Sequence, residues 1–202
     1  MSEEFPPRAE HLREIEILTE VLTSVVDGRS ALYVSSPLTT GQRAFEWHRK
    51  NSGVTSLAQM EPHPAFRRDV MEPNRDEAAR FTRDLRETSN RLVIDPTAVG
   101  DLPGWTQADY RVFWGRVIER YVETAVFRDG WQYSSGCAYE FLAASTAGAQ
   151  LLNEDLTPLA LEEGRALLAD AVRESRTRGL PAEFLEHVLE TLEETAMPHL
   201  DR

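Results

Sequence analysis

The residues around Glu140 suit a nucleophilic carboxylate. They form the segment Trp131-Gln-Tyr-Ser-Ser-Gly-Cys-Ala-Tyr-Glu140, and a helix is predicted over residues 136–147. Backbone N–H groups and the dipole at the start of a helix attract negative charge. We therefore expect Glu140 to be ionised, as a carboxylate that attacks a sugar carbon must be. A structural role as the Glu of a capping box is disfavoured, because that box needs Ser or Thr at position 137, which is Cys.

Small polar, acidic and aromatic residues also gather where three predicted strands end. In an open parallel sheet, ligands bind beyond the carboxyl ends of the strands. The candidate ligand-contacting residues there are Tyr33, Ser35, Ser36, Asp95, Asp129, Trp131, Ser134 and Ser135, with Gly136 at the start of the helix that follows. Ordinary structural roles remain open for them, because serines also serve as turn residues and helix caps, and aromatic residues usually pack in the core.

The elements that must position these residues follow from hydrophobic periodicity. Buried strands are predicted over residues 31–35, 92–94, 124–127 and 150–152. Helices are predicted over residues 8–26, 75–91, 106–121, 136–147, 161–175 and 182–194. Strands alternate with helices, which predicts an α/β domain with a flavodoxin- or Rossmann-like parallel sheet flanked by helices, and with extra N-terminal and C-terminal helices. Residues 42–74 are poorly periodic and are interpreted as an insertion or a lid.

Composition excludes several classes of protein. A chain of 202 residues with 41% hydrophobic content suits a single domain over residues 1–202. No signal-like start and no apolar stretch of about 20 residues occurs, so we expect a cytoplasmic protein without a membrane partner. A single cysteine and five histidines without ligand spacing imply no metal and no cofactor. The net charge of −12 argues against binding to a long nucleic acid.

Two segments carry a resemblance to a known family. Tyr33-Val-Ser-Ser-Pro-Leu-Thr-Thr-Gly41 and the segment from Trp131 to Glu140 resemble the nucleoside 2-deoxyribosyltransferase-like superfamily, which includes 2′-deoxynucleoside 5′-monophosphate N-glycosidases. The match covers about residues 30–155, and a C-terminal helical pair follows over about 160–196. The resemblance implies a small-molecule nucleoside or nucleotide as partner, and a homodimer or larger assembly.

The resemblance also implies roles for individual residues. Glu140 attacks the anomeric carbon and forms a covalent glycosyl intermediate, as in retaining glycosidases. Ser134, six residues earlier, contacts the ligand near the phosphate, which favours a nucleoside 5′-monophosphate. Tyr33 lies against the carboxylate or the sugar, and Trp131 stacks on the base or caps the pocket.

A second acidic group is expected to assist departure of the base. Asp109 is the first candidate, since it matches the family's acidic residue at the middle helix, and Asp95 and Asp129 are the alternatives. Thr106-Gln-Ala-Asp109 is also a capping box by itself, which explains Asp109 without catalysis.

The expected activity is hydrolysis of the base–sugar bond of a nucleoside 5′-monophosphate, by a nucleotide N-glycosidase. Three alternatives stay open: a deoxyribosyltransferase that passes the sugar to another base, a glycohydrolase acting on a dinucleotide such as NAD, and a nucleotide sensor without catalysis. Fold resemblance does not decide among them.

Overall fold

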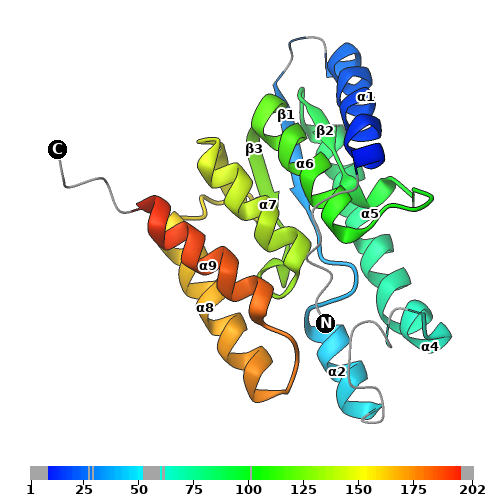
Figure 1. Ribbon diagram of the computed structural model, residues 1–202, viewed down its shortest axis with the longest axis vertical. Helices are drawn as coiled ribbons and strands as arrows, with labels where there is room; N and C mark the ends of the chain where they lie inside the picture. The colour runs from blue at the N-terminus through cyan, green and yellow to red at the C-terminus, as the bar shows by residue number, and fades with distance from the viewer. Residues whose placement is uncertain are drawn as a thin grey trace.

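The structure is a computed structural model, and its central element is a four-stranded parallel sheet (Figure 1). The described residues are 9–26, 28, 30–51, 60, 62–100 and 102–196. The strands are β1 Ala31–Ser35, β2 Leu92–Ile94, β3 Val122–Phe127 and β4 Gln150–Asn153. Their order in the sheet is β2-β1-β3-β4, and all neighbouring pairs are parallel. This is the strand order of flavodoxin-like folds, so the predicted α/β class is confirmed.

One face of the sheet carries most of the helices and the larger part of the core. The helices on this side are α1 Ala9–Val26, α6 Gln107–Tyr121, α7 Ser135–Thr146, α8 Leu161–Thr177 and α9 Glu183–Ala196. Tyr33, Phe127 and Phe141 are fully or almost fully buried in this core. The extra helices predicted at both ends therefore complete the main core (Figure 1).

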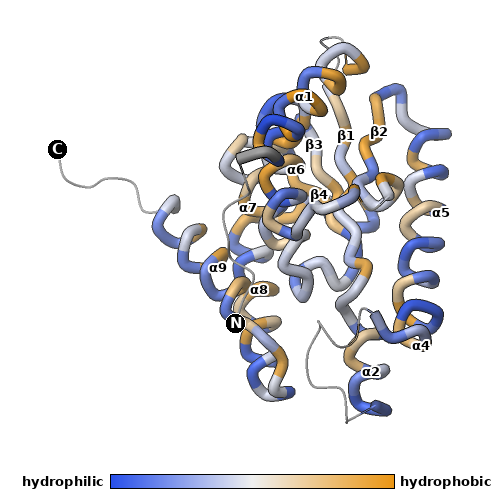
Figure 2. The backbone as a smooth tube through the Cα atoms, turned by 45° about the vertical axis from the view of Figure 1, so that its right-hand side comes forward, coloured by the Kyte–Doolittle hydropathy of each residue, from blue (hydrophilic) through white to orange (hydrophobic). Residues whose placement is uncertain are grey.

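The opposite face of the sheet packs against α5 Glu72–Thr88. Side chains alternate between the two faces of a strand, so Leu32 and Val34 of β1 contact this second layer while Tyr33 faces the first. Figure 2 shows the difference between the layers, since α5 is mostly hydrophilic along its length whereas the strands are largely hydrophobic. In the part of the chain that the structure describes, no helix is long and apolar enough to cross a membrane.

The described residues between 42 and 71 form a lobe with its own small core, whereas residues 52–59 and 61 of the segment interpreted as an insertion or a lid lie outside the described residues. The lobe contains α2 Gln42–Lys50, α4 Pro64–Phe66 and a π-helix over Arg67–Met71 that runs directly into α5. Its buried apolar side chains are Ala44, Trp47, Met60, Phe66 and Val70. Leu180, from the connection between α8 and α9, packs against this cluster.

The helix predicted over 75–91 begins earlier, at Glu72, despite Pro73. Proline is tolerated in the first turn of a helix, where its missing N–H is not needed. The wider π-helical turn just before Pro73 supplies the transition from α4. The other predicted helices and strands are present within a few residues of their expected ends, except that Arg8 lies outside the described residues.

Candidate functional site

Two side chains of β1 hold the carboxylate of Glu140. The Tyr33 hydroxyl donates to Oε1 at 2.9 Å, and the Ser35 hydroxyl donates to Oε2 at 2.6 Å. Tyr33 and Ser35 are two positions apart on one strand, so both point toward α7, which carries Glu140. The structure thus brings together three of the residues singled out from the sequence, at the carboxyl end of the sheet.

The charge state of Glu140 differs from the expectation. Only 9% of the residue is exposed, and this burial raises its pKa to about 7. The hydrogen bonds from Ser35 and Tyr33 act in the opposite direction, and the nearby negative charge of Asp95 adds to the increase. The dipole of a helix acts mainly within its first turn, whereas Glu140 lies in the second turn of α7. The effect of burial on the pKa of Glu140 therefore outweighs that of the helix dipole, and Glu140 is partly protonated at neutral pH.

The groups beside Glu140 remain protonated. Burial first, and then the charge of Glu140, raise the pKa of Tyr33 well above its ordinary value, so Tyr33 acts as a hydrogen-bond donor. Its ring packs edge-on against Trp114, with the ring centroids 6.0 Å apart. Burial also raises the pKa of the Cys137 thiol to about 12, which agrees with the interpretation of Cys137 as a buried packing residue and not a second nucleophile.

Asp95 lies at the end of β2, next to the strand that carries Tyr33. Ile94 pairs with Tyr33 in the parallel ladder, so Asp95 leaves the sheet at the same edge as Ser35. Its Oδ1 accepts two hydrogen bonds from Thr97, one from the backbone N–H at 2.9 Å and one from the hydroxyl at 2.7 Å. Thr97 had no place among the candidates from the sequence, although Asp-Pro-Thr is a typical turn pattern in which Asp accepts such bonds.

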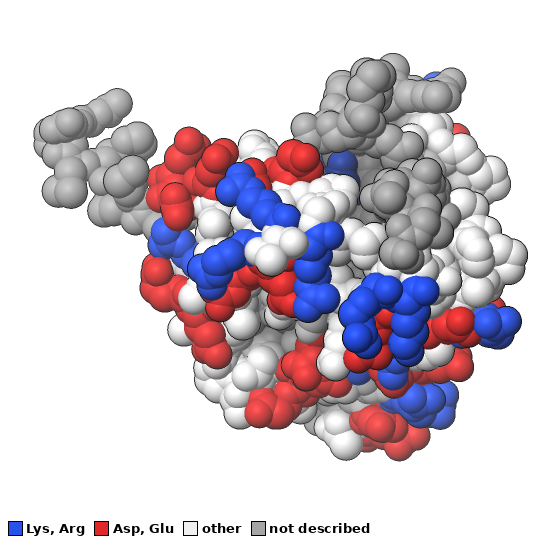
Figure 3. Space-filling view, turned by 90° about the horizontal axis from the view of Figure 1, so that it is seen from below, with Lys and Arg blue, Asp and Glu red and all other residues white. Residues whose placement is uncertain are grey.

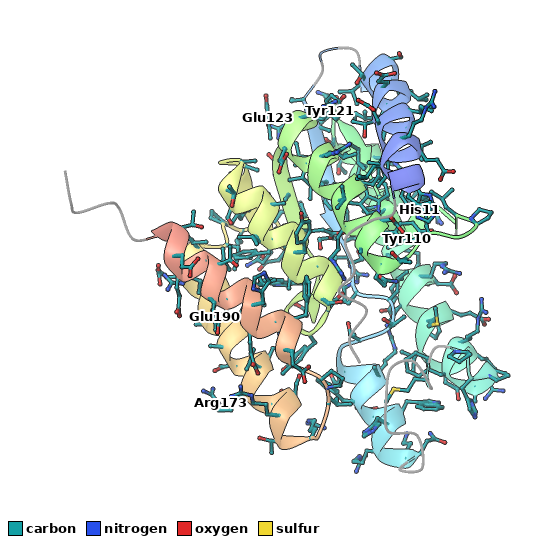
Figure 4. All side chains as sticks on the ribbon, in the orientation of Figure 1. His11, Tyr110, Tyr121, Glu123, Arg173 and Glu190 are labelled. Carbon is teal, nitrogen blue, oxygen red and sulfur yellow. The ribbon has the colours of Figure 1, made fainter. Side chains whose placement is uncertain are left out.

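Asp109 lies in the first turn of α6, where its carboxylate is bonded to Thr106 and His11. Its Oδ2 accepts hydrogen bonds from the backbone and hydroxyl of Thr106, both at 2.7 Å, and lies 3.1 Å from Nδ1 of His11. The residue is fully buried, and Figure 4 shows His11 of α1 beside the start of α6. Burial tends to raise the pKa of Asp109, but the bonds to Thr106 and His11 outweigh it and the pKa is lowered. The capping box expected as the structural explanation is thus present.

The aromatic and serine residues of the 131–140 segment have structural contacts. Trp131 is 3% exposed and stacks on Phe141 with the ring centroids 4.5 Å apart, so it packs in the core of this structure. The Ser134 hydroxyl is the N-cap of α7 and accepts from the backbone N–H of Cys137. Gly136 lies in the first turn of the same helix.

Two further candidates lie on the loops beyond β1 and β3. Among the described residues, the buried Ser36 hydroxyl has no hydrogen-bond partner. Asp129 is exposed, and its backbone N–H donates to Glu154 at 2.8 Å. Neither residue hydrogen-bonds to Glu140, so the direct contacts of Glu140 remain those from β1.

A cavity of about 460 Å³ opens at the same edge of the sheet. Its lining comes from the loops after β1, β3 and β4 and from α2 and α5, so it spans the point between β1 and β3 where the strand order reverses. Arg43 and Arg128 line it, and each pairs with a glutamate, Arg43 with Glu77 and Arg128 with Glu154 at 2.8 Å. Glu140 is not among the residues that line this cavity. Figure 3 views this end of the molecule, where basic and acidic residues are interleaved.

An aromatic contact joins the lobe to the 131–140 segment and to α8. The Tyr133 ring packs edge-on against Phe45 with the centroids 4.8 Å apart, and the Tyr133 hydroxyl donates to Glu174 at 2.5 Å. Arg178 lies 4.9 Å above the Phe45 ring and also bonds to Glu174. Sequence reasoning missed this cluster because the three segments are distant in the chain and none carries a motif for it.

Comparison with known proteins returned no match to the chain among family models, curated proteins or solved structures. Within the described ranges, no group of three or more His, Cys, Asp or Glu residues is placed to hold a metal ion.

Proposed function

We propose that the protein is an N-glycosidase that cleaves the base–sugar bond of a nucleoside or deoxynucleoside 5′-monophosphate through a covalent glycosyl–Glu140 intermediate. The observation that carries the proposal is the fixed carboxylate of Glu140, with one oxygen bonded to Tyr33 and the other to Ser35. A carboxylate held on both oxygens at the ligand-binding edge of a parallel sheet is oriented for attack on a substrate carbon.

The first chemical step uses the ionised form of Glu140. Its pKa of about 7 leaves a substantial ionised fraction at neutral pH, and the two hydroxyl donors stabilise that form. One Glu140 oxygen attacks the anomeric carbon, the bond to the base nitrogen breaks, and the base leaves with the electron pair. Water then attacks the same carbon and releases the sugar phosphate and free Glu140, so the anomeric configuration is retained.

The preference for a 5′-monophosphate rests on the start of α7. The Ser134 oxygen accepts from Cys137, which leaves the hydroxyl hydrogen of Ser134 able to donate to a phosphate. The N–H groups of the first turn of α7 add a favourable electrostatic environment for an anion. Ser134 and Glu140 stand on the same helix, which would place the phosphate and the anomeric carbon of one nucleotide along its first two turns.

The proposal is tested by incubating the protein with a panel of nucleosides, nucleoside 5′-monophosphates and NAD, and by detecting released base chromatographically. We expect base release from a monophosphate, with Glu140→Gln lowering the rate by at least about 10³-fold, because the nucleophile is lost. Glu163→Gln removes an exposed carboxylate of α8 and serves as the matched control with unchanged rate. Base release that persists in Glu140→Gln would refute the covalent mechanism.

A second candidate is a nucleotide-binding domain without catalysis. The observation that favours it is the capping box of Asp109, which commits the first-choice assisting acid to Thr106 and His11. Calorimetric binding of a monophosphate with no base released over hours would favour this candidate. Adding a free acceptor base to the same incubations separates a transferase from a hydrolase, because a transferase yields a new nucleoside.

A further inference from the structure

Asp95 is a second carboxylate at the edge of the sheet where Glu140 is held. It leaves β2 directly after Ile94, the residue paired with Tyr33, and the Tyr33 hydroxyl in turn contacts Glu140. The negative charge of Asp95 raises the pKa of both Glu140 and Tyr33, so the three groups interact electrostatically. Asp95 therefore belongs to the same site, on the strand next to the one that holds the nucleophile.

Only one oxygen of Asp95 has a structural role. Both bonds from Thr97 go to Oδ1, and Oδ2 accepts no hydrogen bond from the described residues. Capping the short 3₁₀ turn after β2 requires a single oxygen and no burial, yet only 7% of Asp95 is exposed. The cap of this turn therefore does not by itself account for the burial of Asp95.

We propose that Asp95 is the general base of the second half-reaction, an assignment that rests on the proposed glycosidase function. Its Oδ2 accepts a proton from the water that attacks the anomeric carbon of the glycosyl–Glu140 ester. As the bond from water oxygen to carbon forms, the bond from that carbon to Glu140 breaks and its electron pair returns to the carboxylate. The proton on Asp95 then passes to solvent, and both carboxylates regain their starting state.

The charge of the two carboxylates favours this order of events. In the free protein the charge of Asp95 opposes ionisation of Glu140. Once Glu140 is esterified it carries no charge, so this repulsion disappears in the intermediate. Both bonds from Thr97 go to Oδ1, which leaves Oδ2 as the oxygen that takes the proton.

The other candidate carboxylates fit this role less well. Asp109 is fully buried and bonded to Thr106, with its other oxygen also enclosed. Asp129 is exposed on the loop after β3, where no described contact fixes its side chain.

The test is rapid-quench kinetics of Asp95→Asn with the monophosphate that the wild type hydrolyses. Asparagine keeps an oxygen that can accept from Thr97 but cannot take a proton. We expect a burst of about one equivalent of base per active site, followed by turnover slowed roughly 10² to 10⁴-fold. Intact-protein mass spectrometry should show a glycosyl phosphate adduct, which peptide mapping places on Glu140. Azide, which attacks without needing a base, should restore turnover and yield a glycosyl azide.

Control variants separate the possible failures. Asp84→Asn, an exposed carboxylate of α5, should show neither burst nor adduct, and Asp95→Ser gives a second variant should the amide disturb folding. If the wild type hydrolyses the nucleotide but Asp95→Asn and Asp95→Ser show no burst, no adduct and no azide rescue, the role of Asp95 is refuted while the proposed function stands. If the wild type releases no base at all, the proposed function itself fails, and the role of Asp95 with it.

Discussion

The Ser35 hydroxyl donates a 2.6 Å hydrogen bond to Oε2 of Glu140, across 105 positions of sequence. Together with Tyr33 it stabilises the ionised form of a carboxylate that burial disfavours. The balance between these effects determines the pH at which Glu140 becomes charged, and it can be changed one bond at a time.

Ser35→Ala should raise the pKa of Glu140 further. Hydrogen bonds to a charged group contribute about 1.5 to 3 kcal/mol, equivalent to about one to two pKa units. The acidic limb of the pH–rate profile should move to higher pH by that amount, and ¹³C NMR of labelled glutamate should report the same change. Ser145→Ala, whose hydroxyl bonds to a backbone carbonyl in α7, is the control. An unchanged midpoint in Ser35→Ala would contradict the stabilising role of this bond.

The stability of the protein should fall as Glu140 ionises. Its pKa is about 7 when folded and near the ordinary 4.5 when unfolded, so the folded state holds the proton more tightly. The contribution is fully favourable below pH 4.5, declines between pH 4.5 and 7, and is lost above pH 7, an effect on the order of 3 kcal/mol.

Glu140→Gln removes this dependence. Denaturant unfolding at several pH values should show the variant gaining on the wild type as pH rises from 4.5 to 8. A difference between the two proteins that stays constant over this range would show that Glu140 titrates normally.

Asp109→Asn should destabilise the packing of α1 on α6. The change weakens charge-assisted bonds to Thr106 and His11, and a loss of about 1 to 3 kcal/mol is expected from thermal or denaturant unfolding. A double-mutant cycle with His11→Ala should give a non-zero coupling energy. The pH midpoint of Glu140 should stay unchanged, and a large shift in it would instead place Asp109 in the catalytic site.

Gly164→Ala should disturb the core beneath the 131–140 segment. An ideal Cβ at this position would lie 2.1 Å from Cζ of Phe141, which stacks on Trp131. Overpacking of this kind costs about 1 to 3 kcal/mol, and tryptophan fluorescence should change with it. Gly100→Ala meets nothing within 4 Å and is the matched control. Equal stability of both variants would show that Phe141 moves aside freely.

Much of the fold could be predicted because its signals are local. The apolar run of residues 31–35 and the capping pattern of Thr106 to Asp109 each specify an element within a few residues. The juxtaposition of Tyr33, Ser35 and Glu140 was partly predictable, since strand alternation and a helix after β3 converge at one edge.

What could not be predicted depends on burial and on distant contacts. In the sequence, the position of Glu140 near the start of a helix predicts an ionised carboxylate. In the structure, burial in the surrounding core raises its pKa. Trp131 was a candidate for ligand contact, but its environment depends on Phe141 and on the three-dimensional packing of α7. The pairing of Arg43 with Glu77 is likewise invisible in sequence, because neither residue belongs to a periodic pattern that involves the other.

The packing of Leu180 against the lobe has a consequence for the order of folding during synthesis. The lobe residues Trp47 and Phe66 leave the ribosome long before Leu180, which completes their apolar contacts. All four strands precede Leu180 in the chain, so the apolar contacts of the lobe are completed only after every strand has been synthesised. Released chains truncated before residue 180 should therefore expose these aromatic side chains to chaperones, and released chains that include Leu180 should not.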